Sequence, residues 1–309
     1  MQYFIGMDVG GTYARMKVAD NAGKVIGAFE GQGGTISSAS FETVQARYNA
    51  LIGGALNALG LDAKDCAGLC LGASGIDTEA LHAQYMRTLL EIGFQEQCIR
   101  AYNDGEMLLY LVPDRPSIAV IAGTGSIVVG KGMQGQKARY GGWSYLLSDE
   151  GSASYIIRKA FEAVIRYWDG YGTCSVLAEV FAGETGLQNQ QQAATYFFEN
   201  VHQKEQISRF APLVEKAAVQ GDKVALGILQ ASAERLFLGL GVVAEKIGIG
   251  DAPFAVIPWG SVMVHNVYLA EALQKLVYER YPNADIISLK GDAVDSALEI
   301  AQTIPGAAV

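Results

Sequence analysis

The sequence predicts an α/β protein built from two similar halves, each with a mixed sheet that opens with a three-stranded meander. The prediction rests on an internal repeat: residues 3–31 and 117–142 each alternate apolar strands with a glycine- and threonine-bearing turn and a polar glycine turn. Helical periodicity follows each meander, at residues 41–60 and 152–170. Strands that alternate with helices are typical of mixed sheets with helices on their faces. Two copies facing each other would leave a cleft, which is a common place for a ligand.

In the first half, two more apolar runs follow the meander, and each ends in a polar turn. The runs "AGLCLGASGID" at residues 67–77 and "IRAYNDGEMLLYL" at residues 99–111 are predicted strands, with a helix between them at residues 79–93. The half ends near "VPDRPS", residues 112–117, where two prolines interrupt any periodicity. We therefore expect a first domain of residues 1–116.

The second half is more helical than the first. Helical spacing covers residues 205–248, and apolar runs at residues 253–262 and 284–289 predict a return to strands. We expect a second domain of residues 117–291. A closing helix at residues 292–305 is expected to pack back on the first domain.

Composition excludes several classes of partner. The chain of 309 residues has a formal net charge of −9 and no basic stripe, so we expect neither nucleic acid nor an anionic membrane as a partner. It has no run of about 18 apolar residues and no signal-peptide pattern at its start, which favours a cytoplasmic protein. Its four cysteines do not make a disulfide framework, and Cys66 and Cys70 are interpreted as small buried hydrophobes. The oligomeric state stays open, a homodimer included.

Two glycine-rich turns stand at matching places in the halves: "DVGGT" at residues 8–12 and "GTGS" at residues 123–126. Each by itself is an ordinary hairpin turn. As a pair they predict a phosphate site, because glycine lets backbone N–H groups approach phosphate oxygens and the hydroxyls add donors. We predict that ATP phosphates lie between the turns, with Asp8 holding a hydrated Mg²⁺. The predicted ATP-binding residues of the turns are Gly10, Gly11, Thr12, Gly123, Thr124 and Gly125.

A single acid, Asp104 in "AYNDGEM", follows the apolar start of the run at residues 99–111. Asn-Asp-Gly is an ordinary turn sequence, which is the simpler interpretation. A kinase, however, needs a carboxylate that accepts the proton of the attacking hydroxyl and orients that hydroxyl toward the γ-phosphate. Asp104 is the candidate for this role by its position.

The stretch "GGWSYLLSDEGS" at residues 141–152 combines a glycine pair, an aromatic side chain and two adjacent acids before a helix. One interpretation is a loop in which Asp149 and Ser152 cap the helix. The other is a sugar platform, in which Asp149 or Glu150 accepts hydrogen bonds from sugar hydroxyls and the glycine backbone lies against the ring. The residues alone do not decide between the two.

Taken in order, "DVGGT", "GTGS", "GGWSYLLSDEGS" and "WGSVM" resemble the motifs of the BadF/BadG/BcrA/BcrD ATPase family, within the sugar-kinase, heat-shock-70 and actin superfamily. The resemblance covers nearly the whole chain, and its most specific segment is similar to the family's Gly-Gly-Trp-Gly…Gly-Asp-Glu-Gly-Ser stretch. It implies a two-domain actin-like ATPase fold with ribonuclease H-like halves. The family includes N-acetylglucosamine kinase and bacterial glucosamine kinase, whose two domains bind Mg-ATP between them and close on the sugar.

The resemblance also implies roles for individual residues. Asp104 would be the catalytic base, and Thr12 and Thr124 would contact ATP phosphates. Nucleoside contacts would come from Gly221 and Gly260. Sugar-binding roles are implied for Ser74, Asp104, Gly142, Trp143 and Asp149.

This chain also departs from the family pattern. The family often has glycine where Ser144 and Ser148 stand, and Trp259 occupies the place of the first glycine of an adenosine-contacting pair. An asparagine that holds the sugar in N-acetylglucosamine kinases is often found in the loop that here carries Thr35, Ser37 and Ser38. These departures leave the identity of the sugar open.

We therefore predict an ATP- and Mg²⁺-dependent kinase that phosphorylates glucosamine or N-acetylglucosamine at the 6-hydroxyl. Two alternatives stay open. One is an ATPase that activates a redox enzyme, as the family's dehydratase activators do with a cysteine-held iron–sulfur cluster. The other is a sugar sensor that has lost catalysis.

Overall fold

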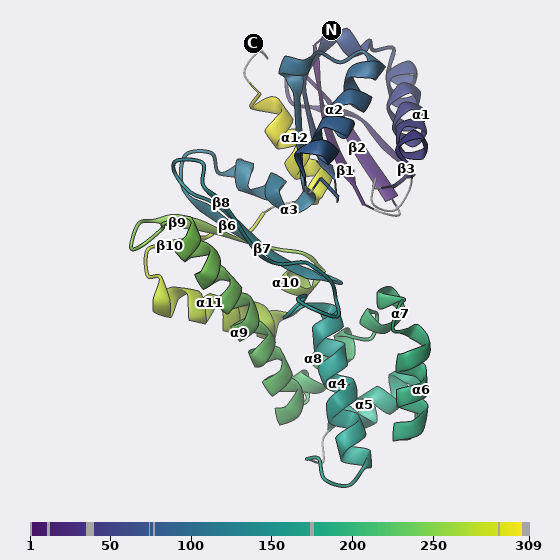
Figure 1. Cartoon of the computed structure of the whole chain (residues 1–309), viewed down its shortest axis with the longest axis vertical. Coiled ribbons are helices and arrows are strands. Elements are labelled where there is room, and N and C mark those ends of the chain that lie inside the picture. The colour runs from purple at the N-terminus through teal and green to yellow at the C-terminus, as the bar shows by residue number, and fades with distance from the viewer. Residues whose placement is uncertain are drawn as a thin grey trace. The chain divides into compact units, whose positions relative to one another are not determined.

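The computed structural model describes residues 2–10, 13–34, 40–73, 75–76, 78–173, 176–289 and 291–304. The chain divides into two compact units: unit 1 is Met1–Pro113 with Leu289–Val309, and unit 2 is Asp114–Ser288. Each unit has one five-stranded mixed sheet with helices packed on it (Figure 1). The predicted α/β class with two similar halves is confirmed. The divisions between the units fall a few residues earlier than the predicted boundaries.

The sheet of unit 1 has the strand order β3-β2-β1-β4-β5. Its strands are β1 (Tyr3–Val9), β2 (Tyr13–Asp20), β3 (Val25–Gln32), β4 (Cys66–Ala73) and β5 (Ile99–Tyr102). The first three form the antiparallel meander, whereas β4 and β5 run parallel to β1. The sheet is mixed because a short turn returns the chain antiparallel, while a crossover through a helix returns it parallel.

Helices cover both faces of this sheet. On one face lie α1 (Phe41–Leu59) and α2 (Glu79–Ile92), and on the other lie α3 (Asp104–Met107) and α12 (Ala293–Gln302). Successive residues of β1 point to opposite faces, so Ile5 packs with α1 and α2 while Phe4 packs with α12. The described part of the unit also contains three short 3-10 helices, at Ala63–Asp65, Glu96–Cys98 and Leu108–Leu111.

A missing side chain lets α12 lie directly on β1. A Cβ at Gly6 would stand only 2.3 Å from the backbone nitrogen of Leu298, and one at Gly68 on β4 would stand 2.1 Å from the carbonyl oxygen of Ala301. Backbone atoms cannot move aside as a flexible side chain can. Glycine at both positions therefore permits this close packing of helix on sheet.

The sheet of unit 2 repeats the topology of unit 1 strand for strand, in the order β8-β7-β6-β9-β10. Its strands are β6 (Ser117–Ala122), β7 (Ser126–Lys131), β8 (Lys137–Gly141), β9 (Phe254–Trp259) and β10 (Ala284–Ile286). Again the first three strands form an antiparallel meander, and the later two run parallel to its first strand. The repeat seen in the sequence is thus a repeat of architecture.

Over the residues that the structure describes, unit 2 carries more α-helices than unit 1. They are α4 (Ala153–Trp168), α5 (Val176–Thr185), α6 (Gln190–Asn200), α7 (Lys204–Ser208), α8 (Pro212–Val219), α9 (Lys223–Lys246), α10 (Ser261–His265) and α11 (Val267–Arg280). Its core joins Ile118 of β6 to Ile157 of α4 and Leu240 of α9.

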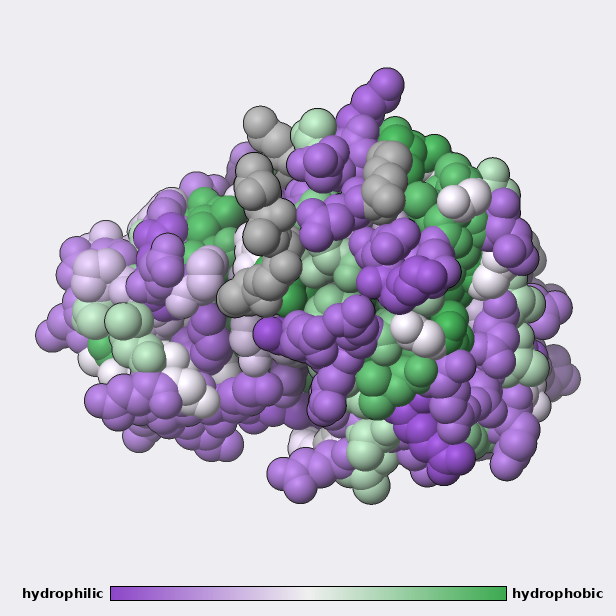
Figure 2. Space-filling view, turned by 90° about the horizontal axis from the view of Figure 1, so that it is seen from above, coloured by the Kyte–Doolittle hydropathy of each residue, from purple (hydrophilic) through white to green (hydrophobic). Residues whose placement is uncertain are grey.

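Within the described residues, α9 is the helix whose length and composition would allow it to cross a membrane, with a mean hydropathy of 1.4. Apolar residues of this helix pack inside the protein, because Leu229, Leu236 and Val243 are buried in the core of unit 2. The face of the molecule drawn in Figure 2 is mostly hydrophilic, with hydrophobic residues in separate patches. We therefore interpret α9 as a core helix of unit 2.

Candidate active site

In unit 1, the predicted carboxylates lie at one edge of the sheet. Asp8 on β1 is in register with Gly72 on β4, which is in register with Tyr102 on β5. Neighbouring strands lie about 4.8 Å apart, so Asp8 is about 10 Å across the sheet from the end of β5, where Asp104 follows. This is the carboxyl end of three parallel strands, where α/β proteins commonly bind ligands. The predicted site residues Gly11, Thr12 and Ser74 lie outside the described residues.

Asp8 is held by an arginine that the sequence reasoning missed. Arg15 stands opposite Asp8 on β2, and its Nη2 donates to Asp8 Oδ2 at 2.7 Å. Burial raises the pKa of the Asp8 carboxyl above its ordinary value, while the hydrogen bond and charge of Arg15 act in the opposite direction. The sequence gives little indication of this contact, because Arg15 meets Asp8 through the register of β1 and β2 and belongs to no motif.

Gly10 continues from Asp8 into the turn. Its N–H donates to the carbonyl of Tyr13 at 2.9 Å, and its own carbonyl accepts from the N–H of Gly34 at 3.0 Å. A Cβ at Gly10 would make only an ordinary contact among the described residues, at 3.7 Å from Tyr13 O. Packing against the described residues therefore does not require glycine here.

Asp104 opens a short helix and does not sit in a simple turn. The side chain of Asn103 accepts from the N–H of Gly105 at 3.0 Å, which caps the four-residue helix α3. Asp104 Oδ1 accepts from the same N–H at 2.9 Å. The predicted strand at residues 99–111 consequently ends at Tyr102, because the capped helix begins directly after it.

In unit 2, the "GTGS" turn joins β6 to β7 and packs on the start of α4. The carbonyl of Gly123 accepts from the N–H of Ala153 at 2.9 Å, and the carbonyl of Thr124 accepts from Ser154 Oγ at 2.7 Å. These contacts satisfy donors at the helix N-terminus and fix the turn against it. A Cβ at Gly123 would meet its nearest neighbour, Ser261 Oγ, at an ordinary 3.6 Å.

Asp149 lies against this turn. It is 9% exposed, and a Cβ at Gly125 would stand 2.4 Å from its Oδ2. Burial raises the pKa of the Asp149 carboxyl above its ordinary value, opposed by the charges of Lys204 and Arg139 and by a hydrogen bond from the Ser126 backbone. The helix cap itself is Ser152, whose side chain accepts from the N–H of Tyr155. The capping interpretation therefore holds for Ser152, whereas the side chain of Asp149 faces the turn.

The neighbouring acid, Glu150, is engaged elsewhere. Tyr140 donates its hydroxyl to Glu150 Oε2 at 3.1 Å, and Arg235 stands 3.7 Å from Oε1. Of the two acids named as sugar acceptors, Asp149 is the one beside the turn.

The glycine pair before Trp143 has a second feature that the sequence reasoning missed. Gly141 and Gly142 both adopt left-handed backbone angles, with φ of 72° and 71°. Arg139 donates from Nε to the carbonyl of Gly141 at 3.1 Å and from Nη2 to that of Gly142 at 2.6 Å. Its guanidinium carbon lies 4.2 Å from the ring centroid of Trp143, whose side chain is 70% exposed. Arg139 thus fixes the loop that presents the indole.

A pocket of about 330 Å³ opens beside the turn of unit 2. Thr124, Ser261 and His265 contribute to its wall from the turn and from α10, and Ser208, Ala211 and Pro212 line it from the α7–α8 segment. The α7–α8 residues were not predicted, since no motif marks them. Gly260 borders this region with φ of 96°, and a Cβ there would stand 2.5 Å from Ala122 O, so both backbone and packing require glycine.

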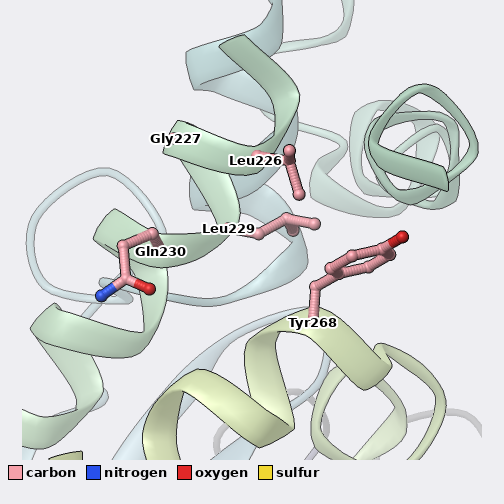
Figure 3. Close-up of a pocket in the computed structure, with 5 residues that line it drawn as sticks. All are labelled: Leu226, Gly227, Leu229, Gln230 and Tyr268. Carbon is pink, nitrogen blue, oxygen red and sulfur yellow. The ribbon is translucent and has the colours of Figure 1, made fainter. Parts of the chain in front are cut away.

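Gly221 is not among the residues that line this pocket. It lies between α8 and α9 with φ of 79°, a left-handed conformation that suits a helix end. A second pocket of about 300 Å³ lies between α9 and α11. There the ring of Tyr268 points toward Leu226 and Leu229, while Gln230 points away (Figure 3). No predicted site residue lines this second pocket.

Two sheets of one topology, each with a glycine-rich turn after its first strand, define an actin-like ATPase fold. The model of the BadF/BadG/BcrA/BcrD ATPase family matches residues 5–298, and the chain belongs to this family. Membership implies ATP as the nucleotide.

Relatives match the chain over nearly its full length. It is 30% identical over 305 residues to an N-acetylmuramic acid/N-acetylglucosamine kinase of Clostridium acetobutylicum, covering 98% of this chain and 99% of that protein. It is 24% identical to an N-acetyl-D-glucosamine kinase of Dictyostelium discoideum, covering 94% and 95% of the two chains. A solved structure of a candidate N-acetylglucosamine kinase from Chromobacterium violaceum superposes with a TM-score of 0.69 at 23% identity, covering 97% and 99%. That likeness supports the fold.

Proposed function

We propose that this protein is an ATP-dependent kinase that transfers phosphate to the 6-hydroxyl of an amino sugar. One observation carries the proposal: the buried Asp149 of the predicted sugar platform lies directly against Gly125 of the predicted phosphate turn. A kinase must hold the acceptor hydroxyl next to the γ-phosphate, so a sugar ligand and a phosphate ligand have to be neighbours. The Clostridium relative is named for N-acetylmuramic acid and N-acetylglucosamine, and the Dictyostelium relative for N-acetyl-D-glucosamine, which supports an N-acetylated amino sugar.

The glycines of the turns fit a phosphate ligand. Gly10 and Gly123 lack the left-handed angles that demand glycine, and each has room for a Cβ among the described residues. Their lack of a side chain is accounted for if a phosphate group approaches the backbone closely. In this proposal Gly125 has a different role, because its missing side chain makes room for Asp149.

Mg²⁺ fits the donor set at Asp8. Carboxylate oxygen is a preferred ligand of Mg²⁺, which usually takes one or two carboxylates together with phosphate oxygens and water. Within the described residues no group of three or more His, Cys, Asp and Glu side chains could hold a metal, so a cation at Asp8 would share its coordination with the nucleotide. When bound, Mg²⁺ supplies positive charge to the transferring phosphoryl group.

Each protein group then has one task in the transfer. Asp104 accepts the proton of the sugar hydroxyl as that oxygen attacks the γ-phosphate. Asp149 accepts hydrogen bonds from other sugar hydroxyls, and Trp143 contributes an exposed ring to the platform. The pocket beside Thr124 and Ser261 accommodates the nucleoside.

The alternative of a redox-enzyme activator has less support. Such a protein needs exposed cysteines that can hold a cluster between subunits. Cys66, Cys70 and Cys98 are buried, and Cys174 lies outside the described residues. Burial among the sheet and its helices suits the role of small hydrophobes.

A sugar panel tests the proposal. The purified protein is incubated with ATP and Mg²⁺ and with glucosamine, N-acetylglucosamine, N-acetylmuramic acid or glucose, and ADP release is followed. We expect release to depend on an amino sugar, with phosphorus NMR placing the phosphate on the 6-oxygen. The matched control is the 6-deoxy form of the best sugar, which should release no ADP above background. Equal ADP release with and without sugar would favour the activator, and sugar binding without any release would favour the sensor.

A further inference from the structure

The charged residues around Asp8 extend beyond Arg15 to the far end of the chain. Arg15 Nη2 lies 2.7 Å from Asp8 Oδ2, and its Nη1 lies 3.2 Å from Oδ2 of Asp292. Asp292 is the N-cap residue of α12. The guanidinium of Arg15 is thus shared between Asp8, near the start of the chain, and Asp292, near its end.

The end of α12 is a rigid support for this second carboxylate. Gly6 and Gly68 let the helix backbone lie directly on β1 and β4, as described above. A capping box then fixes the helix start, because Asp292 Oδ1 accepts from the N–H of Asp295 at 3.1 Å and Asp295 Oδ2 accepts from the N–H of Asp292 at 3.1 Å. Lys17 of β2 pairs with Asp295 and lies 3.7 Å from Asp292 Oδ1.

Arg15 is the more exposed member of its ion pair with Asp8. Its side chain is 41% exposed, whereas that of Asp8 is 16% exposed. Arg15 donates to Asp8 Oδ2, so a cation that binds this oxygen directly displaces the guanidinium from it. In the arrangement observed, an Arg15 that leaves Asp8 still has Asp292 as a partner.

We propose that Asp292 is a positioning residue for the predicted cation site: it holds Arg15 so that Asp8 can exchange the guanidinium for Mg²⁺. The proposal rests on the proposed function, because it takes Asp8 as the Mg²⁺-binding carboxylate. Without the charge of Asp292, Arg15 loses the partner of its Nη1 atom and keeps Asp8 as its hydrogen-bonded carboxylate, with Glu30 opposite it on β3. Mg²⁺ then competes with a guanidinium that Asp292 no longer holds away from Asp8.

The substitution Asp292→Asn tests this with little cost to the fold. Asparagine caps a helix about as well as aspartate, so the bond to the Asp295 N–H is retained while the charge toward Arg15 is lost. The matched control is Asp295→Asn, which removes an equal charge from the same helix end but touches Lys17 and not Arg15. The readout is the Mg²⁺ concentration that gives half of the rise in unfolding temperature produced by ADP.

We expect Asp292→Asn to raise this Mg²⁺ midpoint by about two- to fivefold, the range typical of a partly exposed ion pair. Asp295→Asn should leave it near the wild-type value. In an Arg15→Met background, Asp292→Asn should have no further effect, because the guanidinium that couples the two sites is gone.

Equal midpoints for Asp292→Asn and Asp295→Asn would overturn the proposal, since a general charge effect would then explain both. An ADP response that needs no Mg²⁺ in the wild type would overturn it as well. The measurement uses no sugar and no phosphate transfer. A wild type that binds Mg-ADP but phosphorylates nothing would therefore contradict the kinase assignment alone.

Discussion

Gly125 lies so close to Asp149 that a methyl group on the glycine would stand 2.4 Å from the Oδ2 atom of the acid. The contact joins the turn between β6 and β7 to the segment that precedes α4. It explains why a glycine follows Thr124 although its backbone angles do not require one.

The first prediction compares the two glycines of this turn. Gly125→Ala should destabilise the protein by about 1–3 kcal/mol, the usual cost of overpacking, and should weaken sugar binding by moving Asp149. Gly123→Ala should change stability by less than about 0.5 kcal/mol, because its Cβ meets only ordinary contacts. It should instead reduce the stabilisation by Mg-ADP. Thermal unfolding with and without ADP separates the two effects, and equal destabilisation by both variants would contradict the packing argument.

The second prediction concerns the pH dependence of Asp149. Because burial raises the pKa of this carboxyl, the folded state keeps its proton to higher pH than the unfolded chain does. The contribution of Asp149 to the free energy of unfolding therefore falls as the pH rises from about 4, the ordinary value for aspartate. Asp149→Asn should unfold at a higher temperature than the wild type at pH 7, with the difference shrinking toward pH 4.

The same variant should bind sugar poorly, since the amide is a weaker acceptor than the carboxylate. The KM for the sugar should rise while stabilisation by ADP is kept. A variant that is less stable than the wild type at pH 7 would show that the charge of Asp149 is compensated in the folded state.

The third prediction concerns the proposed base. Asp104→Asn should lower kcat by about 10²–10⁴-fold, the usual contribution of a positioned general base. Asparagine can still accept from the N–H of Gly105, so the start of α3 should be preserved. Single-turnover transfer and ADP-dependent unfolding together test this. A variant that turns over at the wild-type rate would show that Asp104 is not the general base.

The fourth prediction concerns the packing of α12 on β1. Gly6→Ala should cost about 3 kcal/mol or more, because the methyl group would meet the helix backbone at Leu298 and Val294. The control is Gly54→Ala within α1, where nothing lies within 4 Å of the added carbon. That change should stabilise the protein by about 0.5–1 kcal/mol, since alanine is the better helix former. Denaturant unfolding measures both, and a mild effect at Gly6 would contradict the close packing of α12 on β1.

The fifth prediction concerns Arg139. Arg139→Lys keeps the charge but loses the planar donors that reach the carbonyls of Gly141 and Gly142. We expect a higher KM for the sugar with an unchanged KM for ATP, and Arg139→Met should be at least as impaired. If Arg139→Lys keeps the wild-type affinity for the sugar, sugar binding requires the positive charge near Asp149 and not the hydrogen bonds to Gly141 and Gly142.

The elements and the turns could be predicted from the sequence because their signals are local. Apolar alternation, helical spacing and glycine-bearing turns depend on residues a few positions apart, and they predicted both meanders and the long helices that follow them. The start of α3 was missed, because Asn103 as a helix cap and Asn-Asp-Gly as a turn look alike in sequence. The choice between Asp149 and Glu150 also stayed open, since adjacent acids differ only in where the fold points them.

What the sequence by itself determined is the duplicated α/β architecture and the glycine-rich turns, since chain geometry and hydrophobic period act over short distances. Only the tertiary structure decided that Asp292 meets Arg15 across 277 positions, that Arg139 holds the loop before Trp143, and that Asp149 faces Gly125. These pairings depend on strand register and on how closely a helix can approach a sheet. Such distances are set by packing across the whole fold, and no local pattern in the chain encodes them.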